Sequence, residues 1–246
     1  MKFQALVVSF LVAVNAGCHD GSSPIRPEVA QETPGPSQPT TARLMPLGDS
    51  ITQADSQHDS YRRPLWQKLK SSGFDIDFVG SQSAHHRGLP PNQDFDMDHE
   101  GHWGWRADEV LDRVGEWADA ELPDIVLVHL GTNDVLQSQS TGSTIDEIGQ
   151  IIDRIRTAKP GVTIFLAQLI PVDNAGRNTA IRSLNEEIRT LAESKNSEHS
   201  PIRVVDQFSG FDPKLDTYDG LHPNSGGEDK MAQNWFSALE EILTSN

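Results

Sequence analysis

The chain has 246 residues, of which 36% are hydrophobic, so it is long and apolar enough to build a sizeable core. Its 20 basic and 36 acidic residues give a net charge of −16, which argues against a nucleic-acid partner, because phosphate binding needs clustered Lys and Arg. The single cysteine, Cys18, excludes an intramolecular disulfide bond.

Residues 1–18 have the pattern of a bacterial export signal. Lys2 precedes an apolar run over residues 3–14, which is too short to span a bilayer, and small residues follow. Cleavage after Ala16 would release a soluble secreted protein. Cleavage before Cys18 would leave that cysteine as a lipidated first residue that tethers the protein to a membrane. Either route predicts an exported protein, and the lone cysteine favours a lipoprotein in the periplasm or on the outer surface.

The composition of residues 19–41 predicts a disordered linker. This stretch is rich in Pro, Ser, Thr and Gly and has almost no large apolar side chains, so it cannot bury enough surface to offset the entropy of ordering. The folded domain is therefore expected to span residues 42–246.

Within that domain, short apolar segments alternate with amphipathic ones. Apolar runs predict strands, and apolar positions three to four residues apart predict helices. Their alternation predicts βαβ units, and hence a three-layer α/β/α sandwich around a parallel five-stranded sheet. The strands are expected at 43–47, 75–81, 124–130, 162–170 and 202–208, and the helices at 60–73, 106–122, 143–161, 178–195 and 226–243.

Polar motifs follow three of these strands. They are Gly-Asp-Ser at 48–50, Gly-Thr-Asn-Asp at 131–134 and Tyr-Asp-Gly-Leu-His-Pro-Asn at 218–224. Ligands of open α/β sheets bind beyond the carboxyl ends of the strands, so the three motifs are expected to converge on one site.

The convergent residues suit ester hydrolysis by a serine. That chemistry needs an accessible hydroxyl, a base, a carboxylate that orients the base, and donors for the oxyanion. Ser50 lies on a tight strand-to-helix turn. His222 supplies an imidazole, and Asp219 can fold back so that its carboxylate meets Nδ1–H of His222, which leaves Nε2 to face Ser50.

The segments GDSIT, GTND and DGLHPN resemble blocks I, III and V of the SGNH (GDSL) hydrolase superfamily, over a stretch from about residue 43 to the last helix. The resemblance implies a flavodoxin-like fold, with Ser50 as nucleophile, His222 as base and Asp219 as the third member of a triad. It also implies an oxyanion hole built from the Ser50 N–H, a block II glycine N–H and the Asn133 amide. No metal and no organic cofactor is implied.

Block II falls in DHEGHWGWRADEV, residues 98–110. It is similar to the same region of carbohydrate esterases, including acetyl xylan esterases, which carry G-x-x-G-W ahead of a helix. Gly104 is assigned to the oxyanion hole because it lies nearest the helix start, and Gly101 is the alternative. Trp103 and Trp105 flank Gly104 and are expected to stack on sugar rings, unless they pack into the core.

Other polar residues are given supporting roles. Asp49 and Asp134 are expected to cap or brace their loops. The acidic run at 94–102 begins like a calcium loop but lacks its glycine and final glutamate, which favours a solvated loop that shapes the cleft. The loop at 83–93, with two adjacent histidines and two prolines, is expected to form a cleft wall.

Taken together, the sequence predicts an exported, monomeric serine esterase whose substrate is an acylated carbohydrate or another small ester, with acetyl groups on polysaccharide favoured. Lysophospholipase or thioesterase activity on the same fold is an alternative. A surface glycan-binding protein without turnover is another, although every catalytic position holds a competent residue.

Overall fold

The computed structural model describes residues 41–244. The predicted signal peptide, and the predicted linker up to residue 40, lie outside the described residues. The first strand begins at residue 42, where the folded domain was expected to start. Among residues 41–244, no helix combines the length and the apolar character that a membrane crossing requires.

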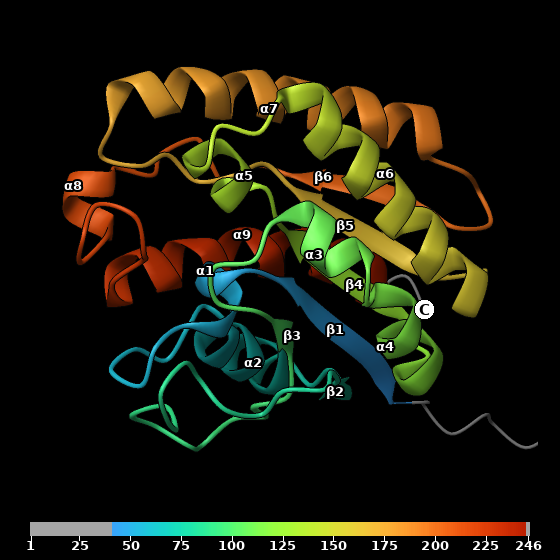
Figure 1. The fold of residues 1–246 in the computed structure, drawn as a ribbon. Helices are drawn as coiled ribbons and strands as arrows, with labels where there is room; N and C mark the ends of the chain where they lie inside the picture. The colour runs from blue at the N-terminus through green and yellow to red at the C-terminus, as the bar shows by residue number, and fades with distance from the viewer. Residues whose placement is uncertain (1–40, 245–246) are drawn as a thin grey trace, which may run out of the picture. The chain divides into compact units, whose positions relative to one another are not determined.

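The centre of the fold is a parallel sheet (Figure 1). Its strand order is β2-β1-β4-β5-β6, and a very short strand, β3, pairs with the carboxyl end of β1. The five predicted strands are therefore all present, and β3 is an addition that two residues are too few to predict. The bounds are β1 Ala42–Gly48, β2 Ile76–Phe78, β3 Glu100–Gly101, β4 Ile125–His129, β5 Thr163–Ala167 and β6 Ile202–Val205.

Helices cover both faces of this sheet, which confirms the predicted α/β/α sandwich. One face packs against α3, α4, α6 and α7, and the other packs against α2 and α9. The helices that cover the sheet are α2 Arg62–Ser71, α3 Ala107–Leu111, α4 Val114–Glu121, α6 Thr141–Ala158, α7 Ala175–Lys195 and α9 Ser225–Leu243.

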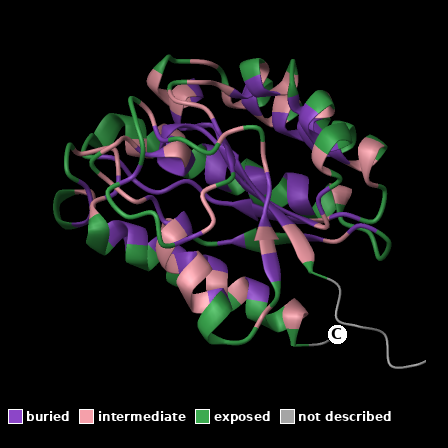
Figure 2. Ribbon diagram, turned by 90° about the horizontal axis from the view of Figure 1, so that it is seen from below, coloured by how far each residue is buried: buried purple, intermediate pink, exposed green. Residues whose placement is uncertain are grey.

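The apolar run of β4 shows how the sequence builds these layers. Val126 and Val128 point into the first core, whereas Ile125 and Leu127 point into the second. All five residues of the strand are buried, as expected for a central parallel strand covered on both faces. Figure 2 shows the buried residues along the sheet and the inner sides of the helices, with exposed residues outside.

The predicted helix at 106–122 is in fact two helices, α3 and α4. Asp112 and Arg113 separate them, and Arg113 leaves helical geometry with φ −120°. Val110 and Val114 lie on either side of the break, and both are fully buried. Because the spacing of apolar residues continues through the break, the periodicity alone predicts one helix.

Three helices of four or five residues are too short to show a helical period; the strand-to-helix turn at Ser50 predicted the start of the first, and the other two were not predicted. They are α1 Ser50–Gln53, α5 Thr132–Leu136 and α8 Pro213–Asp216. The first two begin directly after β1 and β4. They carry the residues of the GDS and GTND motifs.

The strand order reverses at β1. After β1 the chain forms β2 on one side of it, and then returns to form β4 on the other side. Where the strand order reverses, the connections that follow the two neighbouring strands, β1 and β4, run in opposite directions. This leaves a crevice at the carboxyl ends of these strands. The GDS and GTND motifs lie at the two sides of this crevice.

Candidate active site

Ser50 is the first residue of α1, directly after β1. The turn between them needs glycine at position 48, because a Cβ there would collide with the Thr52 side chain and with the His129 carbonyl oxygen. Asp49 caps α1, since its Oδ1 accepts a hydrogen bond of 2.9 Å from the Ile51 N–H. The Ser50 N–H, at the first helical position, has no acceptor within the helix.

The structure brings Ser50, His222 and Asp219 into a continuous hydrogen-bonded chain. Ser50 Oγ lies 3.0 Å from Nε2 of His222, and Nδ1 of the same ring lies 2.7 Å from Oδ2 of Asp219. With the proton of the neutral imidazole on Nδ1, Nε2 is free to accept the serine hydroxyl proton. The three residues come from opposite ends of the domain, 172 positions apart for Ser50 and His222.

The loop around Asp219 folds back on itself. Its other carboxylate oxygen, Oδ1, accepts hydrogen bonds from the N–H groups of Leu221 (3.0 Å) and His222 (2.7 Å). Burial on its own raises the pKa of the Asp219 carboxyl, but the hydrogen bonds and the nearby imidazole outweigh it and hold the pKa below its ordinary value. Asp219 therefore stays ionised beside His222.

Asn133 occupies the first turn of α5. Its amide Nδ2 donates one hydrogen bond, of 2.9 Å, to the carbonyl oxygen of Trp105. A primary amide has two N–H donors, so the second is available to a ligand. The contact also ties Asn133 to the segment that carries block II.

The two candidate glycines of block II differ in what their N–H groups do. The Gly101 N–H donates to Nδ1 of His99 at 2.9 Å and is therefore already used. Gly104 is exposed, has φ +81°, and within residues 41–244 its N–H makes no hydrogen bond. It also lies between Trp103, which contacts His222, and Trp105, which contacts Asn133. The geometry favours Gly104 as the oxyanion donor.

Aromatic rings hold both faces of the His222 imidazole. Trp103 stacks on one face at 4.7 Å between ring centroids, and Tyr218 on the other at 5.7 Å. The column continues outward, with His86 on Trp103 at 4.4 Å and His58 on Tyr218 at 3.9 Å. The sequence analysis missed Tyr218, His58 and His86 as contributors, although the loop that contains His86 was expected to line the cleft.

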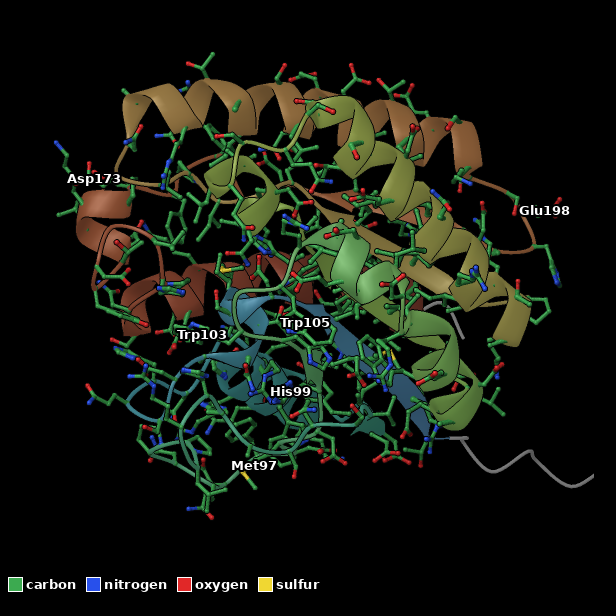
Figure 3. All side chains as sticks on the ribbon, in the orientation of Figure 1. Met97, His99, Trp103, Trp105, Asp173 and Glu198 are labelled. Atoms are coloured by element: carbon green, nitrogen blue, oxygen red, sulfur yellow. The ribbon has the colours of Figure 1, made fainter. Side chains whose placement is uncertain are left out.

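Trp105 has a different environment from Trp103. Its ring stacks on His102 at 4.3 Å and packs against the core that contains Trp117. Figure 3 labels both tryptophans on the segment between β3 and α3. Trp103 therefore lies beside the imidazole, and Trp105 contributes mainly to packing.

Asp49 and Asp134 brace the site, as predicted. Asp134 accepts the Ala107 N–H at 3.2 Å and so anchors the start of α3. Burial raises the pKa of Asp134 to about 6 and that of Asp49 to about 7. Asp49 is fully buried, and the nearby Asp134 carboxylate adds to the effect of burial on its pKa.

A small hollow adjoins Ser50 and His222. Its volume is about 10 Å³, close to the space that one water molecule needs. The hydroxyl of Tyr218 donates to Asp55 at 3.3 Å, which fixes one wall. The remaining walls are formed by Ile51, Ala54, His58, Pro223 and Glu228.

The acidic loop at 94–102 is tied to its neighbours. Asp94 accepts hydrogen bonds from Arg63 at 2.6 and 2.9 Å, and Asp96 accepts the Phe78 N–H at 2.9 Å. Within the part of the chain that the structure describes, no group of three or more His, Cys, Asp or Glu side chains is arranged to hold a metal ion.

Comparison with known proteins places this geometry in a family. The model of the GDSL-like lipase/acylhydrolase family matches residues 47–230. A multidomain esterase from Ruminococcus flavefaciens is 28% identical over 228 residues. That match covers 84% of this chain but only 29% of the relative, so the chain spans less than a third of that protein's length.

Two solved structures have the same fold at higher coverage. A family 3 carbohydrate esterase from Clostridium thermocellum is 32% identical, with a TM-score of 0.72, over 84% of this chain and 98% of that one. A serine-to-alanine variant of an acetyl esterase, crystallised with an acetate ion, is 29% identical, with a TM-score of 0.74, over 83% and 99% of the two chains. These matches confirm the predicted fold and the carbohydrate-esterase resemblance, and the chain belongs to the GDSL-like lipase/acylhydrolase family as a carboxylic ester hydrolase.

Proposed function

We propose that the protein is an exported serine esterase that removes O-acetyl groups from polysaccharide. The observation that carries the proposal is the hydrogen-bonded chain from Ser50 through His222 to Asp219. Export rests on the signal-like residues 1–18 and on the lipidation candidate Cys18. The protein acts as a monomer on the acylated carbohydrate.

In the first half-reaction, Ser50 Oγ attacks the acyl carbon while Nε2 of His222 takes the hydroxyl proton. Asp219 stabilises the imidazolium and keeps its ring oriented. The negative oxygen of the tetrahedral intermediate accepts hydrogen bonds from the N–H groups of Ser50 and Gly104 and from the Asn133 amide. The bond to the alcohol oxygen then breaks, and His222 returns its proton to that oxygen.

In the second half-reaction, water attacks the acyl group on Ser50. His222 takes a proton from the water, and the same donors hold the oxyanion. Collapse of this intermediate breaks the bond to Ser50 Oγ, which regains its proton from His222. The acid is released and the free enzyme is restored.

The preference for acetyl is supported by the size of the hollow beside Ser50. At about 10 Å³ the hollow holds little more than a water molecule, so a long acyl chain does not fit there without movement of its walls. The similarity to an acetyl esterase and to a carbohydrate esterase points the same way.

The test is a panel of esters of graded acyl length together with acetylated xylan, assayed with the wild-type protein and with Ser50→Ala. We expect acetate esters to be hydrolysed fastest, acetate to be released from the polymer, and both activities to disappear in Ser50→Ala while circular dichroism is unchanged. A fluorophosphonate probe should label only the wild type. Activity that survives in Ser50→Ala would refute the nucleophile, and a preference for acyl chains longer than six carbons would indicate a lysophospholipase or thioesterase instead.

A further inference from the structure

Two hollows that share lining residues lie at the same edge of the sheet, and together they are called the groove here. The first, of about 350 Å³, is lined by Asp219, Gly220 and Leu221 from that loop. The second, of about 310 Å³, lies between the start of α6 and the start of α7. Both are lined by Leu136 and Arg177, so the two hollows adjoin each other at these side chains.

We propose that this groove binds the carbohydrate chain of the ester substrate, with Arg177 as its main hydrogen-bond donor. The inference rests on the proposed function and extends it, because it assigns a binding site for the sugars on either side of the acetylated one. The groove passes the loop of Asp219 and His222, and the imidazole must return its proton to the sugar oxygen of the leaving group. Asp219 lines the first hollow and is hydrogen-bonded to the imidazole, which places that hollow next to the catalytic histidine.

The backbone of Arg177 is fixed at the start of α7, and its side chain is exposed. Its backbone N–H donates to Oδ1 of Asn174 at 3.0 Å, which caps the 21-residue helix α7 and fixes Arg177 in the first turn. Within residues 41–244, its guanidinium makes no hydrogen bond or ion pair. Its five donors are therefore available to a ligand in the two hollows that Arg177 lines.

The remaining lining has the mixed character that sugars require. Asp173 lines the same hollow as Arg177 and offers acceptors, so the hydroxyls of a bound sugar can both donate and accept there. Leu136 and Leu221 offer apolar surface for the C–H face of a ring. Figure 3 shows Asp173 near the beginning of α7. Ser138, Gln139 and Thr141 continue the polar lining in the second hollow.

The first variant, Arg177→Ala, removes the donor. We expect the ratio of kcat/KM on acetylated xylan to kcat/KM on a small acetate ester to fall about tenfold, mostly through KM on the polymer, as for the loss of a hydrogen bond to a charged group. The matched control is Arg182→Ala on the same helix. Arg182 lies over the ring of Phe208 and lines a separate hollow, so this variant should keep the wild-type ratio.

The second variant, Gly176→Trp, fills the far part of the groove without removing a charge. A Cβ on Gly176 approaches only Oδ1 of Asn174, at 3.5 Å, which is ordinary contact, so the fold should tolerate the substitution. We expect it to lower the same ratio as Arg177→Ala does. Melting temperatures of all variants check that folding is retained.

The outcomes separate this proposal from the proposed function. In one outcome, the wild type hydrolyses acetate esters, and Arg177→Ala and Gly176→Trp have the same ratio of polymer to small-ester kcat/KM as Arg182→Ala on a set of acetylated polysaccharides. The groove assignment is then wrong and the esterase assignment stands. If Gly176→Trp instead impairs only long-chain esters, the groove holds an acyl chain and the glycan assignment is overturned. If no wild-type ester hydrolysis is detected, the proposed function fails. Calorimetry with acetylated xylo-oligosaccharides then still decides whether the groove binds sugar. It compares the affinity of Ser50→Ala with that of the double variant Ser50→Ala/Arg177→Ala.

Discussion

At the scale of single residues, the His222 imidazole is held by three neighbours. Asp219 fixes Nδ1, and the rings of Trp103 and Tyr218 fix the two faces. A ring restrained in this way keeps one tautomer and one orientation, so Nε2 stays directed at Ser50. Two of these three neighbours lie within four residues of His222 in the chain, whereas Trp103 comes from the block II segment.

The first prediction separates the two tryptophans of block II. Trp103→Ala should lower kcat about tenfold or more, because loss of one stacking ring lets the imidazole move, and its melting temperature should change little. Trp105→Ala should lower the free energy of unfolding by about 3 kcal/mol, because it opens a cavity against the core. Steady-state kinetics and urea unfolding of both variants provide the check. Equal effects of the two substitutions on both quantities would contradict the distinct environments described here.

The second prediction concerns the oxyanion donor. Asn133→Ala should lower kcat by about 10²–10³ with little change in KM, because the amide binds the oxygen more strongly once that oxygen is negative. The variant also loses the bond to the Trp105 carbonyl, so Asn133→Gln serves as a control that keeps the amide but moves it. A decrease of less than fivefold for Asn133→Ala would exclude it from the oxyanion hole.

At the scale of elements, Ser50 is positioned by the close packing of α1 against β1 and β3. Gly101, in β3, pairs with Gly48 at the end of β1. A Cβ on Gly101 would lie 2.6 Å from the Gln53 backbone nitrogen in α1, too close for any side chain. This close approach, and not conformational freedom, explains why glycine is needed at position 101.

The third prediction follows from that contact. Gly101→Ala should displace α1, lower the free energy of unfolding by about 1–3 kcal/mol, and reduce turnover because Ser50 moves with the helix. Gly104→Ala is the comparison. A Cβ there meets nothing, and only its φ of +81° disfavours alanine, so the stability loss should be about 1 kcal/mol. Chemical denaturation measures both, and a larger loss at position 104 than at position 101 would contradict the packing argument.

At the scale of the whole molecule, buried ionisable groups make stability depend on pH. Burial raises the pKa of Asp49 from 3.8 to about 7 and that of Glu228 from 4.5 to about 7. Each binds a proton more tightly in the folded state, so each contributes stability at low pH that is lost as the pH rises to about 7. Burial lowers the pKa of His85 and His129 from 6.5 to about 4. These two histidines bind protons less tightly in the folded state, so their contribution to stability increases as the pH rises from 4 to 6.5.

The fourth prediction isolates one of these groups. Asp49→Asn keeps an oxygen that can accept the Ile51 N–H but removes the titration. The wild type should therefore lose stability relative to the variant as the pH rises from about 4 to 7, by an amount on the order of a few kcal/mol, and the difference should be constant above that range. Urea unfolding of both proteins at intervals of pH gives the comparison. A difference that is independent of pH would show that Asp49 does not titrate in this range.

Much of the architecture was predictable from sequence because it depends on local patterns. Five apolar runs separated by helical periods determine a parallel sheet with two helical layers. Asp219 and His222 are three residues apart in a turn-rich loop, so their pairing was also open to prediction. The split between α3 and α4 was not, because Val110 and Val114 keep the same helical spacing on both sides of it.

Other features depend on contacts between segments that are distant in the chain, and only the tertiary structure decided them. The different environments of Trp103 and Trp105 follow from the path of the loop between β3 and α3. That path cannot be predicted from a local sequence pattern. Gly104 is preferred over Gly101 because a His99 ring nitrogen already accepts the Gly101 N–H. The stacked rings around His222 come from loops that follow different strands, and so do the residues that line the groove at Arg177. These loops meet because a parallel sheet brings the carboxyl ends of its strands to one edge.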